Sequence, residues 1–299
     1  MANRGAFSPL LAPGLASIFF KQLKVRKTEY AAWCNVKKSQ RAYEEEYKIA
    51  GLGQLVVKGE GEVYTFDEPL SGDTIRYTHQ TFGLGFRVTE EMLEDDLYGV
   101  MNKMSAELAK AAMYNKDVQA ATILNFASDS TFSGLDGIEL GSTVHPLLGG
   151  GTGSNTFADP TDFDMPSLQA ALELFENWTD DRGFKTDAKP MKVLHGVPNI
   201  WAVGEVLQTE KVPDSNDNAV NIVRSRYGLS DQLLKHLTTT SDWGVISAPG
   251  EHDLKMWMRV DTQFRNSDDP LNGDAIFTTR QRLSTGFGDW RNIVFVQGT

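Results

Sequence analysis

The sequence contains few cysteine and histidine residues. It contains one cysteine, Cys34, in 299 residues, so no disulfide can form within the chain and we expect a reducing compartment. A lone thiol also supplies no paired-cysteine zinc site. The histidines show neither an HxH nor an HExxH spacing; they lie at positions 79, 145, 195, 236 and 252.

Long apolar runs are missing as well. No stretch approaches the ~20 consecutive apolar residues that span a membrane. The first twenty residues have one early arginine and an apolar run interrupted by Pro9 and Pro13, which does not match a secretory signal peptide. We therefore expect no membrane partner.

Negative charge dominates the chain, but it is spread unevenly. The formal net charge is −11; residues 1–50 hold nine Lys and Arg against four Glu, a net of +5, so the remainder carries −16. A basic segment on an acidic body fits an arm that touches an acidic neighbour or nucleic acid. A solvated helix face fits the same charges equally well. With 40% hydrophobic and 23% charged residues, the composition is that of a globular protein.

Carboxylates are concentrated in GFRVTEEMLEDDLYG, residues 85–99, where Glu90, Glu91, Glu94, Asp95 and Asp96 occur together. Such a cluster can bind a metal, transfer protons or begin a helix. Thr89 stands where a hydroxyl caps free backbone N–H groups, and acids in the first turns are favoured by the helix dipole. Asp95 and Asp96 lie at adjacent helical angles and do not stack on one face. Helix initiation is therefore the favoured interpretation.

Two glycine-rich segments fail as phosphate loops. FGLGF (82–86) has Val88 where a dinucleotide fingerprint needs its third glycine, and we interpret it as the joint between a hairpin and a helix. GGGTGSN (149–155) has no lysine after its glycines, so it predicts a flexible loop and not a Walker motif.

Two further segments resemble sites only in part. DSNDNA (214–219) has Ala219 where a calcium loop needs glycine and Ser225 where it needs a bidentate glutamate. Glu251-His252-Asp253 could polarise an imidazole, but the chain has no G-x-S-x-G nucleophile elbow. We predict no catalytic, cofactor-binding or metal-binding residues and no cofactor.

The first expected element is residues 1–40. Their apolar residues do not recur with a sustained helical spacing, so we interpret this segment as an arm. Its large aromatic side chains should be buried against something else, such as another subunit; they are Phe19, Phe20, Tyr30 and Trp33. Residues 41–80 predict a long charged hairpin with glycine-separated strands. Because an isolated hairpin is marginal in water, it needs a surface to lie on.

Apolar residues spaced by three and four then predict one helix over 89–125, about 35 residues and roughly 50 Å long at 1.5 Å per residue, with a weak point at Gly99. A second mixed domain should follow. Asp164 and Pro166 predict the start of a helix, residues 190–197 predict a buried strand, and Pro198 opens another helix. Alternation in DLKMWMRVDTQFR predicts a strand with Leu254, Met256, Met258, Val260 and Phe264 on one face, and AIFTTRQRL and NIVFVQG predict strands after it.

This order of parts resembles the major capsid (head) proteins of tailed bacteriophages, particularly the group that includes Mu-like major head subunits. The resemblance is carried by four co-linear segments: FRVTEEMLEDDLYGVMNKMSAELAKAAMYNKDVQAATILN (86–125), VHPLLGGGTGSN (144–155), the stretch from DMPSLQAALELFENW to VGEVL (164–207) and LSTGFGDWRNIVFVQG (283–298).

The resemblance implies an α+β phage major capsid fold. Residues 1–40 would be the N-terminal arm, 41–82 the extended E-loop hairpin, 83–150 the P domain with its spine helix, 151–250 the inserted α/β A domain, and 251–299 strands that return to the P domain. The chain would then be a structural subunit, and not an enzyme, of the icosahedral head of a tailed double-stranded DNA phage, located in the virion and assembled in the host cytoplasm.

The partners implied are other copies of the chain in pentamers and hexamers, separate scaffold, portal and decoration proteins, and packaged double-stranded DNA contacted non-specifically. No N-terminal coiled coil is present, so no fused scaffold is expected. An encapsulin-like compartment shell is an alternative of the same fold. A cytoplasmic α/β hydrolase or metal-dependent enzyme, using residues 251–253 or the acidic helix start, is the alternative of a different class.

The helix interpretation of the acidic cluster can be tested directly. Glu90→Gln and Glu91→Gln should each lower the free energy of unfolding by no more than ~1 kcal/mol, because each removes only a favourable charge–dipole interaction. Urea denaturation measures this change. An enzymatic turnover abolished by either substitution would contradict the interpretation.

Overall fold

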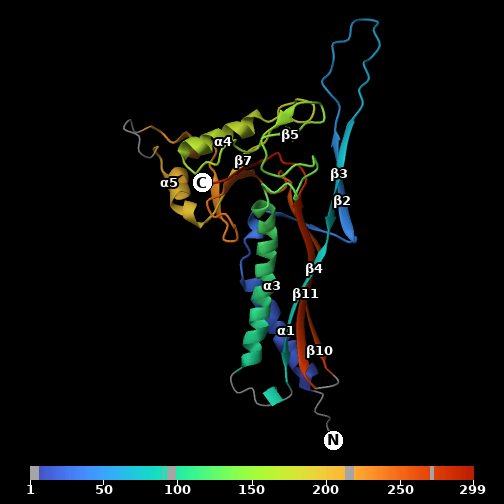
Figure 1. The fold of residues 1–299 in the computed structure, drawn as a ribbon, viewed down its shortest axis with the longest axis vertical. Helices are drawn as coiled ribbons and strands as arrows, with labels where there is room; N and C mark the ends of the chain where they lie inside the picture. The colour runs from blue at the N-terminus through green and yellow to red at the C-terminus, as the bar shows by residue number, and fades with distance from the viewer. Residues whose placement is uncertain (1–6, 90, 93–98, 213–218, 270–272) are drawn as a thin grey trace.

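The computed structural model describes residues 7–89, 91–92, 99–212, 219–269 and 273–299. The molecule is long, with a layer of helices and strands along its lower part, a second lobe at its upper left and a hairpin rising at the right (Figure 1).

The lower part is built on a sheet with the strand order β1-β10-β11-β4. Its strands are β1 (Asn35–Lys38), β10 (Leu254–Asp268), β11 (Ala275–Phe287) and β4 (Gln80–Val88). β1 runs parallel to β10, and the other neighbours are antiparallel. Two helices cover one face: α1 (Phe7–Val25) and α3 (Val100–Asn125).

The two faces of this sheet differ clearly along β11. Alternate residues are buried beneath the helices; they are Ala275, Phe277, Thr279, Gln281 and Leu283. The residues between them are half-buried on the opposite face; they are Ile276, Thr278, Arg280 and Arg282. On β10 the predicted alternation is interrupted by register shifts between Met258 and Val260 and between Val260 and Gln263, which place Val260 opposite Arg282.

The second lobe contains a sheet with the order β12-β9-β7-β8. Its strands are β12 (Ile293–Val296), β9 (Trp243–Ser247), β7 (Pro190–His195) and β8 (Ser230–Leu233). The shorter elements around it are α4 (Met165–Asn177), α5 (Ile200–Gln208), α6 (Ile222–Arg226), η3 (Val197–Asn199), η2 (Tyr30–Ala32), β5 (His145–Pro146) and β6 (Thr152–Gly153).

Several predicted elements are confirmed, and one strand is placed differently. The Asp164 side chain caps α4 by accepting the Ser167 N–H at 2.7 Å, and the Ser167 hydroxyl completes the capping box. We expected all terminal strands to return to the first sheet. β10 and β11 lie in the first sheet. β12 instead pairs with β9 in the second sheet, where all of its side chains are buried.

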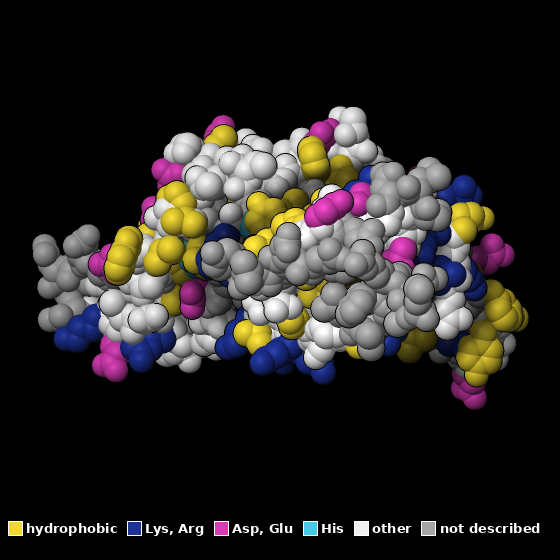
Figure 2. Space-filling view, turned by 90° about the horizontal axis from the view of Figure 1, so that it is seen from below, with side chains coloured by type: hydrophobic (Ala, Val, Ile, Leu, Met, Phe, Trp, Pro, Cys, Tyr) yellow, Lys and Arg dark blue, Asp and Glu magenta, His cyan; other side chains and the backbone are white. Residues whose placement is uncertain are grey.

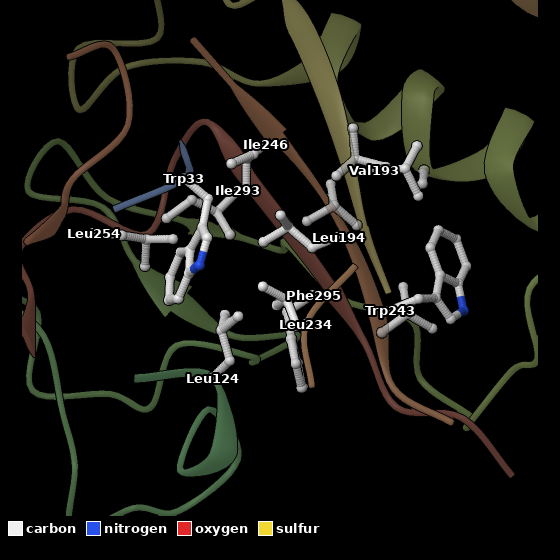
Figure 3. Close-up of a cluster of buried hydrophobic side chains, with 14 of the residues drawn as sticks. Trp33, Leu124, Val193, Leu194, Leu234, Trp243, Ile246, Leu254, Ile293 and Phe295 are labelled. Carbon is white, nitrogen blue, oxygen red and sulfur yellow. The ribbon is translucent and has the colours of Figure 1, made fainter. Parts of the chain in front are cut away.

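One continuous core joins the two sheets (Figure 3). Trp33 and Leu254 come from the first sheet's region, Leu124 from the end of α3, and Leu194 and Ile293 from the second sheet. All are at most 4% exposed. The lobe therefore packs on the lower part as a single folded body.

The N-terminal segment is helical, contrary to the irregular arm that the sequence suggested. Its buried residues Leu15 and Phe19 and partly buried Leu23 recur every fourth position. This apolar stripe is too narrow to stand out beside exposed Phe20. Phe19 is 0% exposed, with its ring centroid 5.0 Å from that of Phe264. Trp33 is 1% exposed. Phe19 and Trp33 are therefore buried, as expected, but within this chain and not against another subunit.

The single helix predicted over 89–125, with Gly99 as its weak point, is not formed as one element. The Thr89 hydroxyl accepts the Met92 N–H at 3.3 Å, as expected of a helix-capping residue. However, Gly99 has φ 64°, a left-handed conformation that cannot lie within an α-helix, and α3 begins after it and has 26 residues. Glu90, Glu94, Asp95 and Asp96 lie outside the described residues.

Both glycine-rich segments are ordered parts of the fold. FGLGF lies within β4, so it is a strand and not a joint. Residues 149–155 form a packed turn and not a flexible loop: a side chain on Gly153 would lie 2.5 Å from the Trp290 ring, and Asn155 is 0% exposed. Within the described ranges, no helix combines the length and apolar character needed to cross a membrane.

The burial of α1 yields a matched pair of substitutions. Phe19→Ala should lower the free energy of unfolding by about 3–5 kcal/mol, because it leaves a cavity beneath the sheet. Phe20→Ala, at a side chain that is 44% exposed, should cost clearly less. Chemical denaturation of the two variants measures the difference; equal small losses would show that α1 does not belong to the core.

Candidate assembly surface

A hairpin projects from the body beyond both lobes (Figure 1). It consists of β2 (Tyr43–Ala50) and β3 (Leu70–Thr78), paired antiparallel from Tyr43 opposite Thr78 to Ala50 opposite Leu70. The predicted hairpin is thus confirmed. We call the segment between the strands, residues 51–69, the tip.

The tip exposes large apolar side chains to an unusual degree. Leu55 is 96% exposed, Val57 95% and Phe66 87%. Others follow the same pattern; they are Leu52, Val56, Val63 and Tyr64. Figure 2 views the molecule from below, and hydrophobic side chains gather at the right-hand end, on the side where the hairpin rises in Figure 1. Concentrated apolar exposure of this kind marks a protein interaction site.

Within the tip, few contacts hold the chain. It forms no strand, and its internal bonds include Glu62 N–H to the Gly59 carbonyl at 3.2 Å and Gly53 N–H to the Asp67 carboxylate at 2.7 Å. Valine, tyrosine and phenylalanine at this density are typical of strands that pack on a surface. No part of the described chain provides that surface, since the side chains remain exposed.

The root of the hairpin, in contrast, is anchored by buried charges. Asp181 lies 3.0 Å from the Lys48 ammonium of β2 and 3.2 Å from the Arg291 guanidinium, and all three residues are at most 9% exposed. Burial by itself raises the pKa of Asp181, but the two cations and an N–H from Leu148 outweigh it and hold the pKa below its usual range. We call Lys48, Asp181 and Arg291 the root triad.

A second group of charges, centred on buried Lys255, also holds the root. Lys255 of β10 contacts both Glu46 of β2 and Asp253, the latter at 2.8 Å, and is 3% exposed. The Tyr77 hydroxyl of β3 donates to the Phe287 carbonyl at 3.0 Å. Because both strands are fixed to the body at their base, the direction in which the hairpin leaves it is fixed as well.

The residues considered for enzyme chemistry have structural roles. His252 is 2% exposed, and burial lowers its pKa to about 4, so its ring is neutral at pH 7. Its Nδ1 accepts the Leu254 N–H at 3.3 Å, and the Asn35 amide donates to its carbonyl at 2.6 Å. Asp253 pairs with Lys255 and not with the imidazole. Glu251, His252 and Asp253 therefore do not form a proton relay.

Two other histidines and the cysteine are also enclosed in the fold. His79 lies between the hydroxyls of Ser39 and Ser284, each 2.9 Å away. His145 contacts Asp136 at 2.6 Å. Cys34 is buried, which raises the pKa of its thiol. Among the described residues, no three His, Cys, Asp or Glu side chains are grouped as metal ligands. The segment that resembles a calcium loop lies outside them, except for Ala219.

Sequence reasoning identified the hairpin but missed the root triad. Nothing local in the sequence pairs Asp181 with Lys48 or Arg291. The sequence contains one weak signal for the triad. Lys48 lies within a hairpin strand, at a position that the alternation of the strand assigns to an inward-facing residue.

Comparisons with known proteins agree with this architecture. A family described as phage capsid protein matches residues 72–296. The capsid of a native GTA particle matches with a TM-score of 0.61 at 9% identity, covering 92% of this chain and 91% of that one. Microbacterium phage Oxtober96 gives 0.59 at 11% identity, with 92% of each chain covered.

A third solved structure, a virus-like particle from Pyrococcus furiosus, gives a TM-score of 0.56 at 7% identity, with 95% of this chain and 98% of that chain covered. At these identities the structures establish a shared α+β fold. No curated protein sequence matches the chain.

The root triad predicts a specific pH dependence. Asp181 has a lowered pKa, so its contribution to stability is complete above the unfolded Asp pKa of about 3.9 and is lost as pH falls through the lower folded value. Asp181→Asn should remove this dependence on pH and lower the free energy of unfolding at pH 7 by about 3 kcal/mol, since it leaves buried Lys48 without a carboxylate and Arg291 with Asp289 alone.

Urea denaturation between pH 3 and 7 measures both effects, with exposed Asp187→Asn as the control for loss of one carboxylate. An Asp181→Asn variant as stable as this control would show that the triad does not anchor the root.

Proposed function

This chain belongs to the phage capsid protein family, and from that membership we propose that its projecting hairpin is the element by which one subunit holds the next. As a member, the protein is structural and not an enzyme. It is a subunit of the icosahedral shell of a phage head and resides in the virion capsid, where copies of the chain assemble with one another.

The observation that carries the proposal is the contrast between the two ends of the hairpin. The root is fixed by buried ion pairs, whereas the tip exposes Leu55, Val57 and Phe66 almost completely. An apolar segment that projects from an anchored root fits a surface on another copy, so residues 41–82 act as an E-loop that lies on a neighbouring subunit. In this arrangement the copies form pentamers and hexamers.

The fold supports an assignment of separate domains within the subunit. The sheet under α3, formed from residues 83–150 together with β10 and β11, acts as the P domain. The lobe within residues 151–250 acts as the A domain around the symmetry axes. The topology supports the assignment of this lobe as an inserted domain, because the chain leaves the first sheet after α3 and re-enters it at β10. Residues 1–40 act as an N-terminal arm, and residues 251–299 return toward the P domain except for β12.

The remaining partners follow from the sequence resemblance. They are separate scaffold, portal and decoration proteins and double-stranded DNA packaged in a tailed phage of the group with Mu-like head subunits. A net charge of −11 supports loose, non-specific contact with the DNA, because an acidic wall does not bind phosphates tightly.

The assembly role of the tip can be tested with one triple variant. Leu55→Asp, Val57→Asp and Phe66→Asp together should leave the free energy of unfolding nearly unchanged, because these side chains are exposed in the isolated subunit. Assembly should fall at least roughly tenfold, since burying each apolar group against a neighbour is worth about 1.5–3 kcal/mol. Particle counts by negative-stain microscopy and sedimentation velocity measure the loss.

The matched control keeps the apolar character with Leu55→Met, Val57→Ile and Phe66→Leu, and it should assemble like the unmodified chain. If the aspartate variant formed normal particles, the tip would not take part in the contact between subunits. An unmodified chain that remains monomeric at high concentration would contradict assembly altogether.

A further inference from the structure

A buried histidine, His145 of β5, has no role in the assembly contact proposed above. It is 0% exposed, and each of its ring nitrogens faces an oxygen atom. Nδ1 lies 2.6 Å from Oδ2 of Asp136, and Nε2 lies 3.1 Å from Oδ1 of Asn155. The ring stacks on that of Trp290 with the centroids 4.5 Å apart, so its orientation is fixed.

The amide of Asn155 is itself held in one orientation. Its Nδ2 donates to the Leu140 carbonyl at 2.6 Å, and its Oδ1 accepts the Ser142 N–H at 3.2 Å. The amide oxygen, and not the amide nitrogen, therefore faces Nε2 of His145. Because an amide oxygen only accepts hydrogen bonds, Nε2 must carry a proton and donate it.

The second ring nitrogen faces a buried carboxylate. The Asp136 side chain is 3% exposed, and its Oδ1 accepts the Ile138 N–H at 3.2 Å. An ionised carboxylate only accepts, so Nδ1 of His145 must donate as well, which makes the ring an imidazolium. The short contact between Nδ1 and Oδ2 fits a charge-assisted hydrogen bond. Without that proton, two acceptors would face each other away from water.

The other charged groups near the ring are already balanced. On the stacked face, the guanidinium of Arg291 lies over the Trp290 ring at 4.8 Å, and it pairs with Asp181 and Asp289. The β6 strand, which pairs with β5, carries no charged side chain. Asp136 is therefore the carboxylate that balances the imidazolium.

The strand that carries His145 leads into a turn that supports the root of the hairpin. In this turn the Leu148 N–H donates to the Asp181 carboxylate at 3.2 Å, and the Gly149 N–H donates to the Asp181 carbonyl at 3.0 Å. The Leu148 side chain also packs on β3, 3.1 Å from the place where a side chain on Gly72 would begin. A displacement of β5 would therefore disturb the root triad.

We propose that His145 and Asp136 form a proton-dependent latch that fixes this turn and, through it, the root of the hairpin. At neutral pH the ring holds a proton on each nitrogen. When the Nδ1 proton is lost, two buried acceptors oppose each other and β5 is released from the segment that carries Asp136. The inference goes beyond the proposed function, because it concerns the folded subunit and does not depend on assembly.

The latch makes the stability of the subunit fall as pH rises. An unfolded histidine loses its proton at about pH 6.5, whereas the folded pair keeps it. Above this pH the folded subunit therefore holds one proton more than the unfolded chain. The equilibrium constant of unfolding should then rise about tenfold per pH unit for as long as the pair keeps its proton.

Asp136→Asn tests this dependence, because the new amide can donate to Nδ1 and leave a neutral ring fully hydrogen-bonded. In urea denaturation between pH 7 and 8, the unmodified chain should show the tenfold rise and this variant should not. Asp187→Asn, at an exposed carboxylate, is the control and should follow the unmodified chain. The same pH dependence in the unmodified chain and the Asp136→Asn variant would overturn the proposal.

Nitrogen NMR of the histidine rings in the unassembled full chain gives a second measurement. At pH 7 both ring nitrogens of His145 should have the chemical shifts of protonated nitrogens. His252 supplies the neutral reference in the same spectrum, because burial lowers its pKa to about 4. An unprotonated Nδ1 on His145 would contradict the latch.

The link to the hairpin root is tested with His145→Phe, which keeps an aromatic ring on Trp290 and removes both ring nitrogens. Hydrogen exchange at the Leu148 and Gly149 amides should become at least roughly tenfold faster, while the amides of α4 keep their protection. Unchanged exchange at Leu148 and Gly149 in the folded variant would overturn the link. If the variant does not fold, the same two amides compared at pH 7 and 9 between the unmodified chain and Asp136→Asn decide the question.

Discussion

The root triad is the interaction on which the shape of this subunit depends. Asp181 belongs to the lobe, Lys48 to the hairpin and Arg291 to the link between β11 and β12, so one buried carboxylate joins three parts of the chain. Removing three charges from water is costly unless each is paired, and here all are. The triad therefore fixes the direction in which the hairpin leaves the body and, with it, the position of the tip relative to the two lobes.

The hairpin has opposite chemistry at its two ends. Its root satisfies buried polar groups within the subunit, while its tip leaves apolar side chains in water. A soluble monomer gains nothing from this exposure. In the proposed assembly these side chains are buried against a neighbouring copy, so the contact between subunits removes from water what folding left exposed.

Much of the local structure could be predicted from the sequence. The capping box at Asp164, the hairpin strands and the terminal strands follow from periodicity and turn residues, which act over a few positions. The Thr89 cap was correctly predicted, as its contact with the Met92 N–H shows. The role of the acids at positions 90 and 94–96 stays a prediction, because they lie outside the described residues. The order of parts, more than any single motif, pointed to the phage capsid family.

The sequence by itself determined the hairpin, the helix capped by Asp164, the terminal strands and the family. Only the tertiary structure decided that α1 belongs to the core, that β12 joins the second sheet, and that Lys48 meets Asp181 and Arg291. The reason is physical: helix and strand periodicity reports which side of an element is apolar, but not which distant element covers it. Pairing across long separations is selected by packing and desolvation of the whole chain, which no local pattern records.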